Sequence, residues 1–304
     1  MDELGILARL RRKIPSLAGS GLVRGIGDDC AVFRPRASED LVFTTDMLIE
    51  DVHFRRATHP AAALGHKTLA RGLSDIAAMG ADPRFCLLSV ALPGWVDEKW
   101  IDQFYRGFLR LAKAHRVILA GGDLARAANL ICDIVVCGSV PKGTALVRDG
   151  AWPGDAIYVS GRLGVSALGL ATGEGTAWRR HLLPSPRVVL GWFLRETLHA
   201  TAAMDLSDGL SLDLHRLCLE SGLSAEIDTP LPVFRGATPE QALHGGEDYE
   251  LLFTVRPDTA VPARFENTPL TRIGTIQKGK PGLIRYLGKP LEPLGYDHFR
   301  RSRS

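Results

Sequence analysis

The sequence lacks any run close to the roughly 18 to 20 uninterrupted apolar residues that a membrane-spanning helix requires. It also lacks a long basic run, because the formal net charge of the 304 residues is only +3 and the basic C-terminal FRRSRS is short. The N-terminal MDELGILARLRRKIP has the pattern of an amphipathic helix, without the apolar core of a secretion signal. We therefore expect neither a membrane nor a nucleic acid as a partner.

Cysteine is scarce, and its spacing argues against two common uses of this residue. The five cysteines are Cys30, Cys86, Cys132, Cys137 and Cys218. Their number is odd and none forms a C-x-x-C pair, which disfavours a disulfide framework or a zinc site. Four of them lie in apolar surroundings, so we expect buried, reduced thiols and a cytoplasmic location.

Several well-known catalytic signatures are also missing. His66 breaks the Gly-Lys pair that a P-loop requires, and GIGDD does not continue as the G-x-G-x-x-G of a dinucleotide-binding fold. There is no G-x-S-x-G serine elbow, DLSDG does not match the spacing of an EF-hand, and no two histidines lie four residues apart. These absences argue against a P-loop fold, a serine hydrolase, a calcium sensor and a zinc hydrolase.

The residues that are present predict a mixed α/β (α+β) fold in two domains. Strand-like runs rich in Val, Ile, Leu and Phe occupy residues 41–46, 85–93, 130–140, 156–161, 224–228 and 249–255. Helix-like runs occupy Asp2–Lys13, Ala62–Met79, Asp97–His115, Pro186–His199 and Leu210–Ser221. Residues 140–155 concentrate Gly, Pro and charge, so we expect one domain at residues 1–148 and a second at residues 149–304.

Five short segments place acids beside Gly, Ser or Thr, where we expect a strand to end or a helix to start. They are residues 25–29 (GIGDD), 44–46 (TTD), 73–75 (LSD), 121–123 (GGD) and 205–209 (DLSDG). Any one of them could form only a turn or a helix N-cap, and Asp208 could simply cap the helix that follows it. If the five segments converge, the repulsion among their carboxylates requires cations. Because Mg²⁺ prefers oxygen ligands together with substrate phosphates, the set predicts metal-dependent polyphosphate chemistry.

The order and spacing of longer motifs add a family resemblance. From the N-terminus, these motifs are GIGDDCAVF, TTDMLIEDVHF, LSDIAAMGADP, GGDLARA, VSGRLG, MDLSDGLSLDL and HGGEDYELLFTV. Together they resemble the thiamine-monophosphate kinase family, which belongs to the superfamily of aminoimidazole ribonucleotide synthetase and selenophosphate synthetase. The resemblance runs from about residue 20 to Phe299, and SDIAAMGADP and GGEDYEL are its most specific parts.

The resemblance implies a reaction and an assembly. The reaction is the ATP-dependent phosphorylation of thiamine monophosphate to thiamine diphosphate, the last step of thiamine diphosphate biosynthesis, by direct in-line transfer with several Mg²⁺ ions. The assembly is a homodimer in which the N-terminal domains bind ATP and Mg²⁺ and form a β-barrel, and the C-terminal α/β domain completes each active site. No acid or base catalyst is expected, because the attacking phosphate oxygen is already ionised.

The resemblance also implies the residues of the site. The metal positions are Asp28, Asp29, Thr44, Thr45, Asp46, Asp75, Asp123, Asp205 and Asp208. The nucleotide contacts are Tyr105, Gly122, Asp123, Arg148 and Ser207. The substrate contacts are His53, one of Glu247 and Asp248, and one of the aromatic residues Tyr296 and Phe299.

Some positions depart from the family pattern, and two other functions stay open. Gly usually precedes VHF and Asn usually precedes LSD, whereas Asp51 and Gly72 stand there in this chain. Glu50 is expected only to face solvent. One alternative is another synthetase or maturation factor of the superfamily, although no reactive cysteine loop of the selenophosphate synthetase kind precedes Cys30. The other is a nucleotide-binding dimer without catalytic activity.

Overall fold

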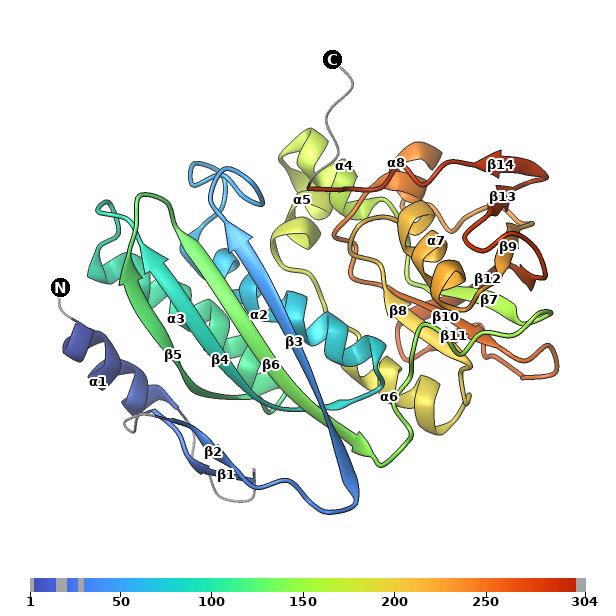
Figure 1. The fold of residues 1–304 in the computed structure, drawn as a ribbon. Helices are drawn as coiled ribbons and strands as arrows, with labels where there is room; N and C mark the ends of the chain where they lie inside the picture. The colour runs from blue at the N-terminus through green and yellow to red at the C-terminus, as the bar shows by residue number, and fades with distance from the viewer. Residues whose placement is uncertain (1–2, 15–20, 27–29, 299–304) are drawn as a thin grey trace. The chain divides into compact units, whose positions relative to one another are not determined.

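Alternating helices and strands fold the chain into two units, each with its own sheet (Figure 1). The computed structural model describes residues 3–14, 21–26 and 30–298. Unit 1 comprises Met1–Ile76 and Ala81–Ala145, and unit 2 comprises Ala77–Gly80 and Leu146–Ser304. The predicted mixed α/β class is confirmed by this arrangement.

Unit 1 is a four-stranded sheet with two long helices on one face (Figure 1). The strand order is β3 (Glu39–Ile49), β6 (Ile131–Pro141), β4 (Asp82–Leu92) and β5 (Ile118–Arg126). β4 and β5 pair in parallel, and the other neighbours are antiparallel. The covering helices are α2 (Ala61–Ala78) and α3 (Glu98–Ala114), and the chain begins with α1 (Glu3–Lys13), β1 (Leu22–Arg24) and β2 (Val32–Phe33).

The pattern of α3 shows how the sequence builds this layer. Asp97 caps the helix by accepting a hydrogen bond from the backbone N–H of Trp100 at 2.7 Å. Its apolar residues recur at steps of three and four, and Ile101, Phe104 and Phe108 are buried. A Cβ at Gly65 of α2 would lie 1.9 Å from the carbonyl oxygen of Phe104, so the two helices touch along their backbones.

The sheet of unit 1 is open in the part of the chain that the structure describes, with β3 and β5 at its edges. Alternate residues of β3 face opposite sides of the sheet, and Phe43 and Met47 on the side away from α2 are 62% and 48% exposed. The β-barrel implied for a dimer is not formed by this chain alone and stays a prediction.

Unit 2 is built on a mixed sheet of eight strands. Along the sheet the order is β14 (Lys289–Leu291), β13 (Ile284–Tyr286), β9 (Ser224–Ile227), β12 (Thr268–Gln277), β7 (Ala156–Ser160), β10 (Leu251–Val255) and β8 (Ala202–Asp205), and β11 (Arg264–Phe265) pairs with β12. The helices are α4 (Val165–Thr172), α5 (Gly175–Leu182), α6 (Val188–Glu196), α7 (Leu210–Glu220) and α8 (Pro239–His244).

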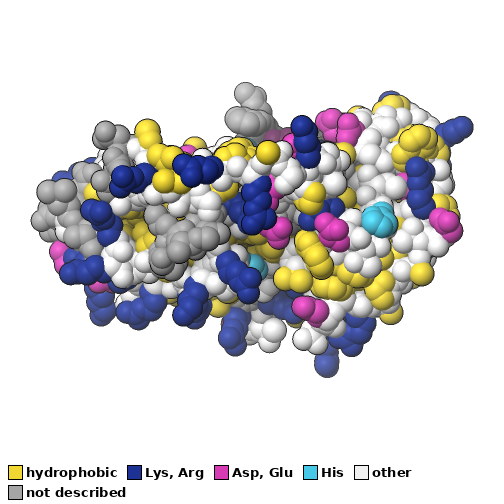
Figure 2. Space-filling view, turned by 90° about the horizontal axis from the view of Figure 1, so that it is seen from below, with side chains coloured by type: hydrophobic (Ala, Val, Ile, Leu, Met, Phe, Trp, Pro, Cys, Tyr) yellow, Lys and Arg dark blue, Asp and Glu magenta, His cyan; other side chains and the backbone are white. Residues whose placement is uncertain are grey.

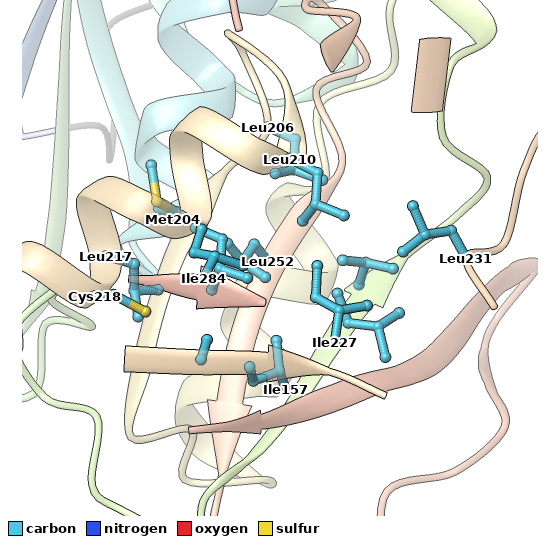
Figure 3. Packing of buried hydrophobic residues seen from close by; sticks show 14 of the residues in the cluster. Ile157, Met204, Leu206, Leu210, Leu217, Cys218, Ile227, Leu231, Leu252 and Ile284 are labelled. Atoms are coloured by element: carbon cyan, nitrogen blue, oxygen red, sulfur yellow. The ribbon is translucent and has the colours of Figure 1, made fainter. Parts of the chain in front are cut away.

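Figure 3 shows the core that joins α7 to this sheet. Leu210, Leu217 and Cys218 of α7 pack in one cluster with Ile157 of β7 and Leu252 of β10. Burying such aliphatic side chains stabilises each by about 1.5 to 3 kcal/mol relative to exposure. The core therefore fixes the loop that precedes α7, which carries three of the predicted site residues.

Three expectations about local structure need correction, and a fourth is confirmed. The TTD segment does not end its strand, because β3 continues through Asp46 to Ile49. The LSD segment lies inside α2 rather than at a helix start, and Asp123 lies within β5. The expected burial of four cysteines is confirmed for Cys86, Cys132, Cys137 and Cys218.

Among the described residues, neither the helices nor the face drawn in Figure 2 shows a feature typical of a membrane span or a patch of one charge. In the described ranges, no helix has both the length and the apolar character needed to cross a bilayer. On the face drawn in Figure 2, Lys and Arg side chains are interspersed with acidic, apolar and neutral ones.

Candidate active site

Two polar pairs join α2 to β3 in unit 1. Arg71 Nη2 donates to Asp46 Oδ1 at 2.9 Å, and Thr44 Oγ1 donates to Asp75 Oδ2. Arg71 and Asp75 lie about one helical turn apart on α2. This distance is close to that between Asp46 and Thr44, which lie two residues apart on one face of β3. The fold thus gathers three of the predicted metal residues, Thr44, Asp46 and Asp75, between the helix and the strand.

The packing of α2 explains the departure at Gly72. A Cβ at this position would lie 2.6 Å from Val136 Cγ2 and 3.6 Å from Thr44 Cγ2. A side chain there would push α2 away from the sheet, and with it Asp75 from Thr44. Glycine is therefore the residue that this helix–strand contact requires.

Thr45 and Asp123, the other predicted metal-binding residues of unit 1 within the described ranges, lie on the opposite face of the sheet. Thr45 Oγ1 donates to Asp133 Oδ1 at 2.9 Å. Ser89 of β4 is the register partner of both Asp133 on β6 and Asp123 on β5, so these side chains share a face. The sequence analysis does not include Asp133 among the site residues. A charged residue within the apolar run CDIVVC could have indicated it.

The turn after β3 holds His53 in a defined orientation. The backbone N–H of Ile49 donates to His53 Nδ1 at 3.0 Å, so a neutral imidazole carries its proton on Nε2. Asp51 adopts a positive φ of 66°, a conformation that glycine adopts without strain and that Asp tolerates better than most residues. The turn therefore keeps a backbone shape suited to glycine, which accounts for the departure at Asp51.

The expectation that Glu50 faces solvent is wrong. Its side chain is buried, and Oε2 accepts a hydrogen bond from the backbone N–H of Leu130 at 2.9 Å. Arg56 Nε also lies 4.0 Å from Glu50 Oε1. Glu50 thus ties the end of β3 to the chain before β6, because an unpaired buried carboxylate would be costly.

Unit 1 carries three of the predicted nucleotide residues, Tyr105, Gly122 and Asp123, and the first two sit in different surroundings. Tyr105 is buried on α3 between Phe104 and Phe108, and burial raises the pKa of its phenol. Gly122 has a φ of 150°, and a Cβ there would lie 1.8 Å from the carbonyl oxygen of Leu88. β5 can therefore approach β4 only because residue 122 is glycine.

Three predicted residues lie outside the described part of the chain. They are Asp28, Asp29 and Phe299.

Two loops of unit 2 that carry predicted site residues are bonded to each other. We call residues 205–209 the DLSDG loop and residues 245–248 the GGED loop. The backbone N–H of Glu247 donates to the carbonyl oxygen of Ser207 at 2.7 Å, and that of Tyr249 donates to Leu206 at 2.9 Å. A third segment joins them, because Tyr296 donates its backbone N–H to the carbonyl oxygen of Asp208 at 2.9 Å.

The DLSDG loop is supported from α7. Asp213 of α7 accepts hydrogen bonds from the backbone N–H groups of Asp208 and Gly209, both at 3.0 Å. Arg216 donates to both Asp208 and Asp213. Asp208 does not cap α7, because the N-cap residue is Gly209 and no side chain caps that helix. Burial, with the nearby charge of Asp208, raises the pKa of Asp213 to about 7.

The two acids of the GGED loop have different surroundings. Asp248 accepts from the backbone N–H groups of Gly164 at 2.6 Å and Ser166 at 2.9 Å, at the start of α4. Burial raises the pKa of Asp248 to about 7 in spite of these bonds. The Glu247 side chain is 22% exposed and lies 3.5 Å from Nδ1 of the buried His181. Glu247 is therefore the acid with access to a ligand, and Asp248 holds the loop to α4.

The remaining predicted residues of unit 2 are Asp205 and Arg148. Asp205 is the last residue of β8 and is buried. Arg148 is exposed, and its backbone carbonyl accepts from Ser221 Oγ at 2.7 Å.

The oxygen-rich side chains suit Mg²⁺ better than a transition metal. Within residues 3–14, 21–26 and 30–298, no group of three or more His, Cys, Asp or Glu side chains is arranged to hold a metal. Mg²⁺ typically takes one or two carboxylates, keeps several waters and binds substrate phosphates. Asp46 with Asp75, and Asp205 with Asp208, offer this number of carboxylates, so the residues fit an ion that binds together with a nucleotide.

Comparison with known proteins identifies the family. Residues 27–140 match the model of the AIR synthase related protein, N-terminal domain, and residues 153–285 match that of the C-terminal domain. The thiamine-monophosphate kinase of Escherichia coli (strain K12) is 42% identical over 98% of both chains.

Solved structures agree with this similarity. The thiamine-monophosphate kinase of Stenotrophomonas maltophilia K279a matches with a TM-score of 0.84 and 38% identity, over 96% of this chain and 98% of that one. The structure of AaThiL complexed with AMPPCP and TMP matches with a TM-score of 0.79 and 32% identity, over 98% of this chain and 97% of that one. The chain therefore belongs to the thiamine-monophosphate kinase family of AIR synthase related proteins.

Proposed function

We propose that this protein phosphorylates thiamine monophosphate with ATP, giving thiamine diphosphate and ADP, in the last step of thiamine diphosphate biosynthesis. The observation that carries the proposal is that a relative, matched over 98% of this chain, has been solved with both AMPPCP and TMP. The use of ATP in biosynthesis, together with four buried thiols, favours a cytoplasmic location.

The phosphate of thiamine monophosphate attacks the γ-phosphate of ATP directly, in line with the leaving ADP. The chain needs no general base, because the attacking oxygen is ionised at neutral pH. Its own residues therefore have to position two anionic groups and offset their repulsion. Bound Mg²⁺ supplies much of that charge neutralisation.

We assign the metal-binding role to the carboxylates and hydroxyls of both units. In unit 1, Thr44, Asp46 and Asp75 form one group, and Thr45 with Asp123 belongs to the opposite face of the sheet. Asp28 and Asp29 keep the role that the family resemblance gives them. In unit 2 the corresponding residues are Asp205 and Asp208, which one loop presents.

We assign nucleotide binding to Gly122, Arg148 and Ser207, with Tyr105 shaping the site from the core. Substrate binding falls to His53, as the family resemblance implies, and to Glu247. Tyr296 is 47% exposed and is bonded to the DLSDG loop, so its ring can stack on a substrate ring; Phe299 is the alternative. A cation–π contact of this kind contributes on the order of 1 kcal/mol.

The two domains expected from the sequence then have different roles. Residues 1–148 bind ATP and Mg²⁺ and form a homodimer, and residues 149–304 supply the remaining site residues. Exposed Phe43 and Met47 on the open face of the unit 1 sheet are apolar side chains that a second copy can cover.

The test is ADP release from Mg²⁺-ATP, measured with and without thiamine monophosphate. The proposal expects release that depends on this substrate. Release without any such dependence points to another member of the superfamily, and no release at all points to a nucleotide-binding protein without catalytic activity. Either result contradicts the proposal.

A further inference from the structure

Arg71 and Asp46 form an ion pair within the group of residues that we assign to metal binding. Arg71 Nη2 lies 2.9 Å from Asp46 Oδ1, and the two side chains are only 15% and 23% exposed. Asp75 is one turn further along α2 and accepts from Thr44, two residues from Asp46 on the same strand face. A fixed guanidinium therefore sits beside two carboxylates that we assign to metal binding.

The charge of this group depends on Arg71. Asp46 and Asp75 are two carboxylates, and Arg71 places a positive charge directly against the first of them. Solvent screens this pair weakly because both side chains are mostly buried, so the attraction is stronger than in an exposed ion pair. The group can consequently keep its folded geometry before any metal arrives.

We propose that Arg71 is a built-in counter-cation of the metal-binding group, which competes with Mg²⁺ for the carboxylate of Asp46. This inference rests on the proposed Mg²⁺-dependent function and names a positioning residue for it. Arg71 acts through Asp46, since it fixes that carboxylate in the metal-free protein and lowers its affinity for the first divalent ion. Mg²⁺ binding is then weak until a nucleotide brings further oxygen ligands.

The residues next to Arg71 favour a role as a counter-cation over a role in packing alone. Gly72 offers no side chain of its own, and Val136 occupies the space beside it. Arg71 is thus the side chain of this turn of α2 that brings a positive charge to Asp46. A residue needed only for packing on the sheet would not have to be a cation.

A matched control lies at the other end of the same strand. Arg84 Nη2 donates to Glu39 Oε1 at 2.8 Å, and Arg84 Nε donates to Ser139 Oγ at 2.8 Å. Their side chains are part-buried, like those of Arg71 and Asp46, but neither residue belongs to the proposed site. Arg84→Met removes a comparable ion pair without touching the metal-binding group.

The experiment measures the melting temperature of the full chain across a series of MgCl₂ concentrations, without nucleotide. It compares the wild type with Arg71→Met, Arg71→Gln, Arg71→Lys and Arg84→Met. Isothermal titration with MgCl₂ gives the affinity directly. A ligand that binds only the folded state raises its stability according to concentration and affinity, so tighter binding gives a larger shift.

We expect Arg71→Met and Arg71→Gln to bind Mg²⁺ on the order of five- to tenfold more tightly than the wild type, the scale of one part-buried ion pair. Their melting temperatures should be lower in EDTA and should recover on adding Mg²⁺. Arg71→Lys, which keeps the charge, should resemble the wild type. Arg84→Met should lose stability equally with and without Mg²⁺.

Equal or weaker Mg²⁺ affinity in both uncharged variants would overturn the proposal, as would equal loss of stability at every Mg²⁺ concentration. If Arg71→Met does not fold, Arg71→Gln decides, because it keeps two hydrogen-bond donors without the charge. Activity of the wild type, measured as ADP release with thiamine monophosphate, is recorded in parallel. An inactive wild type contradicts the kinase function, whereas the Mg²⁺ response of the variants separately decides the role of Arg71.

Discussion

Glu247 donates its backbone N–H to the carbonyl oxygen of Ser207 at 2.7 Å, which fixes the GGED loop to the DLSDG loop. The first carries a proposed substrate residue, and the second carries a proposed nucleotide residue. Because the bond joins the backbones, side-chain substitution at either position leaves it in place. The two roles can therefore be tested separately.

Replacing Glu247 by Gln should weaken thiamine monophosphate binding by about ten- to 100-fold, since hydrogen bonds to charged groups contribute about 1.5 to 3 kcal/mol. ATP affinity should stay within about twofold, because the backbone bond to Ser207 persists. The measurement is the KM for each substrate at saturating levels of the other. A larger change in the KM for ATP than in that for thiamine monophosphate would remove Glu247 from substrate binding.

Asp75→Asn should abolish phosphoryl transfer while the protein stays folded. The amide keeps an oxygen for the hydrogen bond from Thr44 but loses the negative charge that a metal ion requires. We expect kcat to fall by at least ~100-fold, the scale of losing one electrostatic contribution to the transition state.

Asp40→Asn is the control for Asp75, because Asp40 lies on β3, the strand that carries Thr44, and accepts from the backbone N–H of Gly143 at 2.7 Å. Its kcat should be close to that of the wild type, and circular dichroism should show both variants folded. Near-normal turnover by Asp75→Asn contradicts a metal-binding role for Asp75.

Asp248 should make stability depend on pH in a particular direction. Its pKa is raised from 3.8 to about 7 by burial, so the folded protein binds this proton more tightly than the unfolded chain does. The stability that the proton contributes is present below the unfolded pKa and is lost as the pH rises from about 4 to about 7. Asp248→Asn should make this part of the profile less steep, measured by urea unfolding at a series of pH values, while Asp213, whose pKa is also raised to about 7, keeps its own contribution there.

Asp228 provides a control of opposite sign. A hydrogen bond from Arg272 lowers its pKa, so its contribution is present at neutral pH and is lost as the solution is acidified. Asp228→Asn should therefore leave the slope between pH 4 and 7 close to that of the wild type. If Asp248→Asn leaves that slope unchanged as well, Asp248 is not the group that titrates there.

Gly122→Ala should destabilise the protein and disturb the strand that carries Asp123. The added Cβ would lie 1.8 Å from the carbonyl oxygen of Leu88, and the positive φ adds backbone strain. We expect a loss of about 2 to 4 kcal/mol in the free energy of unfolding. Gly94→Ala is the control, because no atom lies within 4 Å of its Cβ position, and equal stability of the two variants would contradict the close approach of β5 to β4.

The sequence predicted the helix at residues 97–115 well because its periodicity reports burial directly. The apolar residues of Asp97–His115 recur at helical steps, and the structure forms α3 there with Asp97 as its cap. β5 was missed because its GGD segment resembles a turn, yet the structure continues the strand through Gly122 and Asp123. Local composition could not show that β4 would pair with these residues in parallel.

The site was less predictable than the core, because its geometry depends on tertiary packing. The sequence predicts residues 44–46 as one group of metal-binding residues, but strand alternation places Thr45 on one face of the sheet and Thr44 on the other. Asp248 and Glu247 are adjacent in sequence, and only the fold separates a residue that binds α4 from one with access to a ligand. No sequence pattern marked Arg71 as a residue of the site, because its partner Asp46 is distant in sequence.

The most direct test of the central claim is to follow the γ-phosphate itself. The protein is incubated with Mg²⁺, thiamine monophosphate and ATP labelled at the γ-phosphate, and the products are separated by chromatography. The account predicts label in the terminal phosphate of thiamine diphosphate, with one ADP formed for each label transferred and no labelled protein. Label that appears only as inorganic phosphate, or that stays bound to the protein, would contradict direct transfer to thiamine monophosphate.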